Sequence, residues 1–141
     1  MSAAAPGFYG KLPGLGDFVS RRLPSAFIDA WDAWLQSVIA GSRAQLGEHW
    51  INTYLSSPLW RFALPPGLAG GLAWAGVLMP SVDRVGRFFP LTVASALPAT
   101  ANPLAVLSSA GAWFEAAETL ALSALDADAF EMERFASGVE A

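Results

Sequence analysis

Residues Gly76 to Thr92, GVLMPSVDRVGRFFPLT, form the clearest structural signal in the chain. The run 72–78 (LAWAGVL) has no polar side chain, which is typical of a strand covered on both faces. Pro80 ends it, and the segment 88–97 (FFPLTVASAL) has the aromatic and β-branched residues of a second strand. The connection between the strands is charged, with Asp83, Arg84 and Arg87 beside Gly86. The sequence predicts a buried hairpin whose rigid, charged turn is open to a partner.

Three more strands are expected before this hairpin. Segments 8–12 and 17–20 flank the turn sequence 13–16 (PGLG), and segment 59–64 ends at the Pro-Pro-Gly of 65–67. The glycines of the first turn lack both the Lys-Ser/Thr of a phosphate-binding loop and the spacing of a dinucleotide site. We therefore interpret them as turn residues, not as a nucleotide site.

A long amphipathic helix is predicted from Ser25, its expected N-cap, to Leu46, with Gly47 as the stop. Trp31 and Trp34 lie on its apolar stripe, and both are expected in the core. A short helical turn over 49–55 follows. It begins at the only histidine of the chain, which has no second histidine or cysteine to complete a metal site.

A second long helix is predicted from the Asn102-Pro103 pair, a good N-cap and first helical residue, to Leu125. Gly111 inside it suggests close packing against another backbone. Asp128 with Glu131 resembles a capping box and predicts a final short helix.

Composition limits the class of protein. The 141 residues are 54% hydrophobic and only 14% charged, with a mean hydropathy of +0.41. No apolar run approaches the roughly 20 residues of a membrane span, and the N-terminus lacks the pattern of a secretory signal. A net charge of −4 disfavours a general nucleic-acid binder, and the absence of cysteine is compatible with the cytoplasm. We expect a cytoplasmic protein without membrane insertion.

These elements predict an α+β fold: a single domain with about five strands in a mostly antiparallel sheet and helices packed on it. The β2-α-β3-α2 order is similar to the longin or SNARE-like arrangement, which by itself says nothing of function. Residues 1–6 are expected to be a flexible end and residues 7–141 the domain.

Four segments together resemble one family: Gly7 to Arg21, Trp31 to Gln36, Pro58 to Leu64 and Gly76 to Thr92. In order along the chain, they are similar to the TagF (ImpM) family of bacterial type VI secretion systems. The resemblance implies a single TagF-like domain that represses the secretion machine after translation. It also implies a partner, the forkhead-associated scaffold protein of that system. Some members of this family carry a PP2C-type phosphatase domain, and nothing in this chain matches one.

The residues agree with a non-enzymatic role without cofactor or metal, because we find no nucleophile with a base and no paired carboxylates in a pattern suggesting catalysis. The candidate partner-binding residues are Lys11, Asp17, Asp83, Arg84 and Arg87. Lys11, Arg84 and Arg87 are expected to form a basic patch for an acidic or phosphorylated surface. The alternative is that Asp83 and the two arginines form a local ion pair that braces the hairpin.

Other classes remain open at this point. One is a structural or chaperone component of the secretion baseplate, and another is an enzyme with an unrecognised pocket. Seven acidic residues and one arginine lie between Glu115 and the C-terminus, which indicates either a solvated acidic face or a second docking surface. The high apolar content also leaves room for a homodimer or a hydrophobic docking face.

Overall fold

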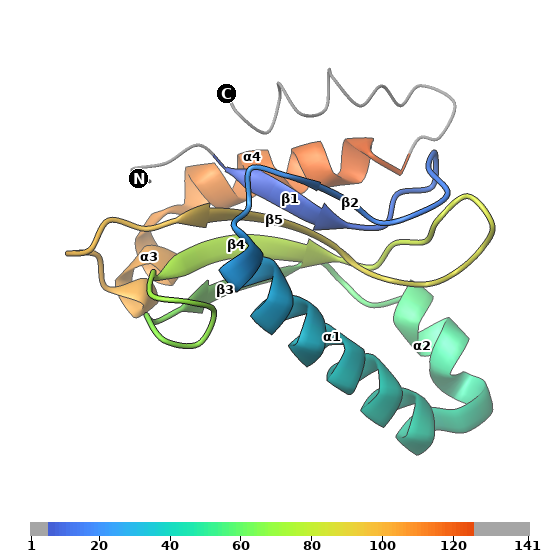
Figure 1. Cartoon of the computed structure of the whole chain (residues 1–141). Helices are drawn as coiled ribbons and strands as arrows, with labels where there is room; N and C mark the ends of the chain where they lie inside the picture. The colour runs from blue at the N-terminus through green and yellow to red at the C-terminus, as the bar shows by residue number, and fades with distance from the viewer. Residues whose placement is uncertain (1–5, 126–141) are drawn as a thin grey trace.

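A five-stranded antiparallel sheet forms the centre of the computed structural model, which describes residues 6–125. Its order is β2-β1-β5-β4-β3, and α1 and α4 lie on opposite faces of it (Figure 1). The strands are β1 (Gly7–Gly10), β2 (Val19–Arg21), β3 (Trp60–Leu64), β4 (Trp74–Met79) and β5 (Leu91–Ala96). The helices are α1 (Ser25–Leu46), α2 (Trp50–Leu55), α3 (Pro103–Ser109) and α4 (Gly111–Ser123), with the 3₁₀ turn η1 (Gly47–His49) between the first two. The predicted α+β class and antiparallel sheet are confirmed.

Several strand boundaries differ from the prediction by one to three residues, and two of these differences have a local cause. β2 begins at Val19 because the Asp17 carboxylate accepts the N–H of Phe18, a local turn contact in place of a strand ladder. β5 begins at Leu91, three residues later than expected. Phe88 forms only an isolated bridge with Val82, and Pro90 has no N–H to give to a ladder.

Three predictions about the ends and the continuity of the helices are wrong. Pro24, not Ser25, is the N-cap of α1, and no side chain caps this end. The predicted helix 103–125 is two helices, because the chain breaks at Ala110, with φ −99° and ψ 37°. This break allows α3 to pack mainly on β3 while α4 packs on β4 and β5. A Cβ on Gly111 would meet nothing within 4 Å, so the expected close backbone packing there is also wrong.

Two predictions about the helix ends are confirmed, and one falls on residues that the structure does not describe. The Asn102 side chain caps α3 by accepting the N–H of Leu104 at 3.0 Å, and Gly47 ends α1 with φ 54°, both as predicted. The predicted final helix at Asp128 lies outside the described residues. Within those residues, no helix combines the length and apolarity needed to cross a membrane.

Two hydrophobic cores cover the two faces of the sheet. Alternation along the strands directs Phe8, Val77 and Val93 toward Phe114 of α4. The opposite face of the same strands packs against Phe27, Trp31 and Leu35 of α1, with Tyr9, Trp74 and Ala94 as its sheet residues. Burial on both faces explains why the central strands read as continuous apolar runs.

Only one of the two predicted core tryptophans of α1 is buried. Trp31 is 6% exposed, stacks on Phe62 with ring centroids 4.6 Å apart, and donates its indole N–H to Thr92 Oγ1 at 2.8 Å. Trp34 is 50% exposed, which corrects the prediction. It stacks on Trp31 and lines two cavities between α1 and the strands, so its ring is packed on one side only.

Candidate functional site

The turn between β4 and β5 is organised by the carboxylate of Asp83. Its Oδ1 accepts the backbone N–H groups of Val85 at 3.0 Å and Arg87 at 2.9 Å, while Oδ2 accepts the Nε–H of Arg87 at 2.6 Å. Gly86 supplies the φ of 91° that the turn requires, and the backbone N–H of Asp83 donates to the Arg87 carbonyl. An acidic residue followed by a glycine and an arginine therefore forms a closed, internally bonded turn.

Lys11 lies beneath this turn and pairs with the same carboxylate. Its Nζ is 3.3 Å from Asp83 Oδ2, and both residues are buried, 7% and 2% exposed. The ammonium group also lies 4.9 Å from the centroid of the Phe18 ring. Removing Asp83 would leave the buried charge of Lys11 without its counter-charge, so this contact holds the N-terminal loop against the hairpin.

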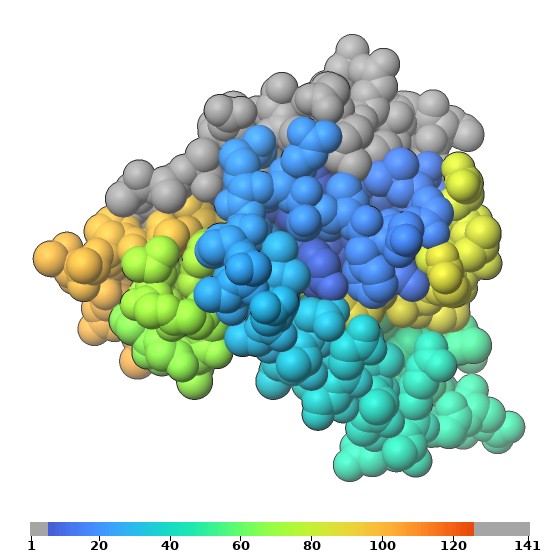
Figure 2. Space-filling view, viewed as in Figure 1, coloured from blue at the N-terminus to red at the C-terminus, as the bar shows by residue number. Residues whose placement is uncertain are grey.

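Further hydrogen bonds join the turn to the loop between β1 and β2. Arg87 Nη2 donates to the Gly16 carbonyl at 2.6 Å, and the N–H of Arg84 donates to the Leu15 carbonyl at 2.7 Å. Ser81 Oγ donates to the carbonyl of Lys11 at 2.7 Å. The space-filling view shows the two segments against each other, the loop in blue and the turn in yellow (Figure 2).

The protonation equilibrium of Asp83 reflects these contacts. Burial alone would raise the pKa of this carboxyl group, but the hydrogen bonds from Arg87, Lys11 and Val85 favour the anion and lower the pKa to about 2. At neutral pH the turn therefore contains a carboxylate between two cations, Lys11 and Arg87.

Tyr54 of α2 supports the turn from the other side. Its hydroxyl donates to the Ser81 carbonyl at 2.8 Å and accepts the Ser81 N–H at 2.9 Å. Burial raises the pKa of the Tyr54 phenol to about 12, which keeps it neutral and able to make both bonds.

The five candidate residues fall into two groups. Asp17, Arg84 and Arg87 are exposed, and Lys11 and Asp83 are buried. The expected patch of Lys11, Arg84 and Arg87 is therefore corrected, because the Lys11 ammonium group faces Asp83 instead of solvent. Asp83 with Arg87 is the local ion pair that was the alternative interpretation, whereas Arg84 is not among the side chains bonded to this carboxylate.

Among residues 6–125, no three His, Cys, Asp or Glu side chains are grouped so that they could hold a metal ion. The structure also reveals an apolar cavity lined by Trp34, Trp50 and Trp60, which is not predictable from the sequence pattern. The signal for it was the number of tryptophans, six in 141 residues, but a sequence pattern does not distinguish a core tryptophan from a half-exposed one.

Comparison with known proteins places the chain in a family. The profile of the type VI secretion system-associated TagF N-terminal domain matches residues 7–141. The chain belongs to the TagF N-terminal domain family. It is similar to the crystal structure of PA0076 from Pseudomonas aeruginosa PAO1, with 54% sequence identity and a TM-score of 0.90. That match covers 95% of this chain and 60% of PA0076, so this TagF domain spans less than two thirds of that protein. Among curated proteins, none matches it in sequence.

Proposed function

We propose that this TagF domain is a non-enzymatic, cytoplasmic regulator that represses the type VI secretion system after translation by binding its forkhead-associated scaffold protein. The observation that carries the proposal is membership of a type VI secretion-associated family over residues 7–141. The family resemblance supplies the expected partner, and the turn between β4 and β5 supplies a candidate contact surface.

The exposed guanidinium groups of Arg84 and Arg87 are the part of this turn that a partner would meet. Arginine binds carboxylate and phosphate groups through two parallel hydrogen bonds, which suits an acidic or phosphorylated surface. The backbone of Arg84 is held by the Leu15 carbonyl and the side chain of Arg87 by Asp83. Such anchoring lowers the entropy lost when a partner binds.

The structure determines which substitution can test this surface. Reversing Arg87 would place a second carboxylate beside the buried Asp83 and would confuse lost binding with lost folding. Arg84→Glu is the cleaner variant, because the Arg84 side chain is exposed and its structural hydrogen bond comes from the backbone. Arg43→Glu on α1 makes the same charge change at another exposed arginine and is the control for charge, with its folding checked by circular dichroism because Arg43 also lies 4.1 Å from the centroid of the Trp50 ring.

The test is calorimetric titration of this domain with the scaffold protein from the same gene cluster. We expect the parent to bind the scaffold protein. Arg84→Glu should weaken this binding about tenfold or more, because it removes one well-placed charged contact. Arg43→Glu should bind with the same affinity as the parent. Equal weakening by both variants would indicate a general charge effect and exclude the turn as the contact. No binding by the folded parent would refute the proposed partner.

Repression is tested separately in cells. Raising the amount of the parent protein should reduce secretion by the type VI system without changing the level of its components, and Arg84→Glu should lose this effect. A protein that instead co-purifies with the assembled machine would be a structural component of it.

A further inference from the structure

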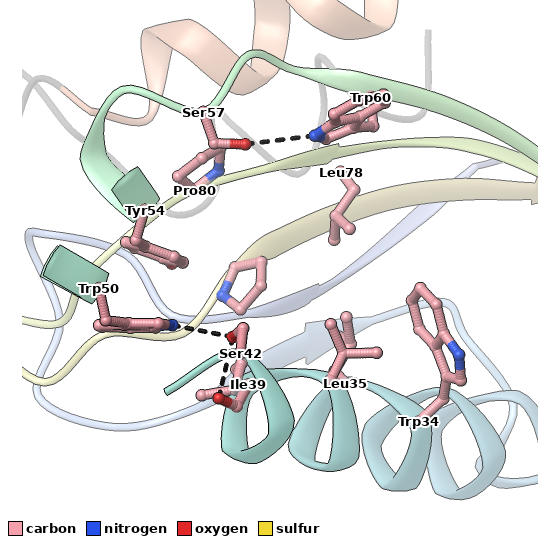
Figure 3. Close-up of a pocket in the computed structure, with 12 residues that line it drawn as sticks. Trp34, Leu35, Ile39, Ser42, Trp50, Tyr54, Ser57, Trp60, Leu78 and Pro80 are labelled. Carbon is pink, nitrogen blue, oxygen red and sulfur yellow. Dashed lines mark hydrogen bonds between the residues drawn. The ribbon is translucent and has the colours of Figure 1, made fainter. Parts of the chain in front are cut away.

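A second surface lies between α1 and the edge strand β3, away from the charged turn. Two cavities, of about 170 and 450 Å³, adjoin each other there and share Trp34 as a wall. In Figure 3, Trp34 and Leu35 face the smaller cavity from α1, Trp60 from β3, and Trp50 and Tyr54 from α2. We call these two cavities with the outer edge of β3 the α1–β3 face.

The lining of the α1–β3 face is apolar. Neither cavity is lined by a charged residue. Two of the three indole N–H groups at the smaller cavity are already used, since Trp50 donates to Ser42 Oγ and Trp60 to Ser57 Oγ. An occupant therefore has to be recognised by apolar contact, not by charge or by these donors.

The strand at this face has an open edge. β3 pairs with β4 on one side and is the last strand of the sheet on the other. It has five residues without proline, and its only charged side chain, Arg61, is held by two hydrogen bonds to Glu118 of α4. An edge strand of this kind can accept another strand, whereas the opposite edge strand, β2, has only three residues.

We propose that the α1–β3 face is the contact of a homodimer, in which β3 of two copies pair antiparallel and continue the sheet across a two-fold axis. Centred on Phe62, this pairing sets Trp60 opposite Leu64 of the second copy, and Arg61 opposite its Ala63. Side chains on the α1 side of the paired strands in one copy then cover the cavities of the other copy. This proposal is independent of the partner proposed for the charged turn.

Charge favours a second copy over an acidic or basic partner. In a two-fold contact each residue meets a different residue of the second copy, except near the axis, where a charged residue would meet its own copy and be repelled. The chain carries a net charge of −4, yet its acidic excess lies from Glu115 onward and the cavities are uncharged. The cavities of the α1–β3 face bring no charge to such an axis, and the charge of Arg61 on β3 is already paired with Glu118.

The exposed apolar side chains of this face supply about half of the area that a stable dimer needs. Four of the lining side chains are about half exposed: Trp34, Val38, Trp60 and Leu68. Together they present on the order of 400 Å², half of the roughly 800 Å² per partner of a stable interface. Partly buried Phe62, Leu64 and Leu78 and the backbone edge of β3 lie beside them and add to this area.

The experiment is sedimentation velocity of the 141-residue chain over a wide concentration range. We expect the mass to rise from 14.8 kDa toward twice that value. Trp34→Glu and Trp60→Glu each change a half-exposed side chain and should weaken dimerisation about tenfold or more. Leu122→Glu, an equally exposed residue on α4, is the matched control and should leave it unchanged. A chain that is monomeric throughout, or a dimer that survives both tryptophan variants, overturns the proposal.

Hydrogen exchange tests the strand pairing itself. Amides of residues 60–64 that face away from β4 should be protected in the dimer and should lose protection on dilution and in Trp34→Glu, which leaves β3 unchanged in sequence. A dimer with unprotected outer amides would overturn the pairing. A monomer whose β3 amides become protected only when the scaffold protein is added would assign the face to a partner's strand instead.

Discussion

The buried ammonium group of Lys11 lies 3.3 Å from the carboxylate of Asp83, although 72 positions separate the two residues in the sequence. This contact joins the end of the first strand segment to the turn of the central hairpin. Lys11 and Asp83 were two of the five residues predicted from the sequence to bind a partner. Their contact with each other instead stabilises the fold. The exposed arginines beside them are left as the surface that a partner can reach.

Substitution of Asp83 by asparagine should strongly destabilise the domain. The neutral amide would leave Lys11 buried without a counter-charge and Arg87 without its ion pair. We expect the Tm of Asp83→Asn to fall by about 5 °C or more in thermal unfolding followed by circular dichroism. Asp17→Asn, at an exposed carboxylate nearby, is the control and should change the Tm little. Equal, small shifts for both variants would mean that the pair does not stabilise the fold.

Acid should remove the stabilisation that Asp83 provides. Its folded pKa of about 2 lies below the ordinary value of 3.8, so the native state favours the anion. The contribution is complete above about pH 5 and is lost as the pH falls through 3.8 toward 2. The measurement is urea unfolding at a series of pH values. The parent should lose more stability than Asp83→Asn across this window, and parallel curves would contradict the assignment.

The buried bond from Trp31 Nε1 to Thr92 Oγ1 should be costly to break from one side. Thr92→Val keeps the shape but leaves the indole N–H unpaired in the core, at a cost of about 1–3 kcal/mol in the free energy of unfolding. In a Trp31→Phe background, which has no indole N–H, the same valine should cost little. Urea unfolding of the four proteins of this cycle gives the coupling energy. A valine that costs the same in both backgrounds would show that the bond contributes nothing.

Gly76 should not tolerate a side chain. A Cβ there would lie 2.4 Å from the Val93 carbonyl oxygen and 2.6 Å from Phe62 Cζ, closer than real Cβ contacts. We expect Gly76→Ala to destabilise the domain by about 3 kcal/mol, and urea unfolding measures this. Gly71→Ala is the control, because a Cβ at Gly71 would meet nothing within 4 Å. Normal stability of Gly76→Ala would require β4 and β5 to separate without cost.

Local patterns in the sequence were enough to predict the order of the strands and helices and the antiparallel sheet. Continuous apolar runs, the helical spacing from Phe27 to Ile39 and the Asn102-Pro103 start of α3 are all properties of neighbouring residues. The break at Ala110 was not predictable in this way, since the apolar spacing continues through it. It follows from α3 packing mainly on β3 while α4 packs mainly on β4.

The same distinction applies to the candidate sites. By itself, the sequence determined that three charges cluster in a tight turn and that tryptophans are abundant, because composition and spacing are local quantities. Only the tertiary structure decided that Asp83 and Lys11 are buried together while Arg84 remains exposed, and that Trp31 is core while Trp34 lines a cavity. The physical reason is that burial depends on which distant segment covers a residue. Here those segments are the loop after β1 and the edge strand β3.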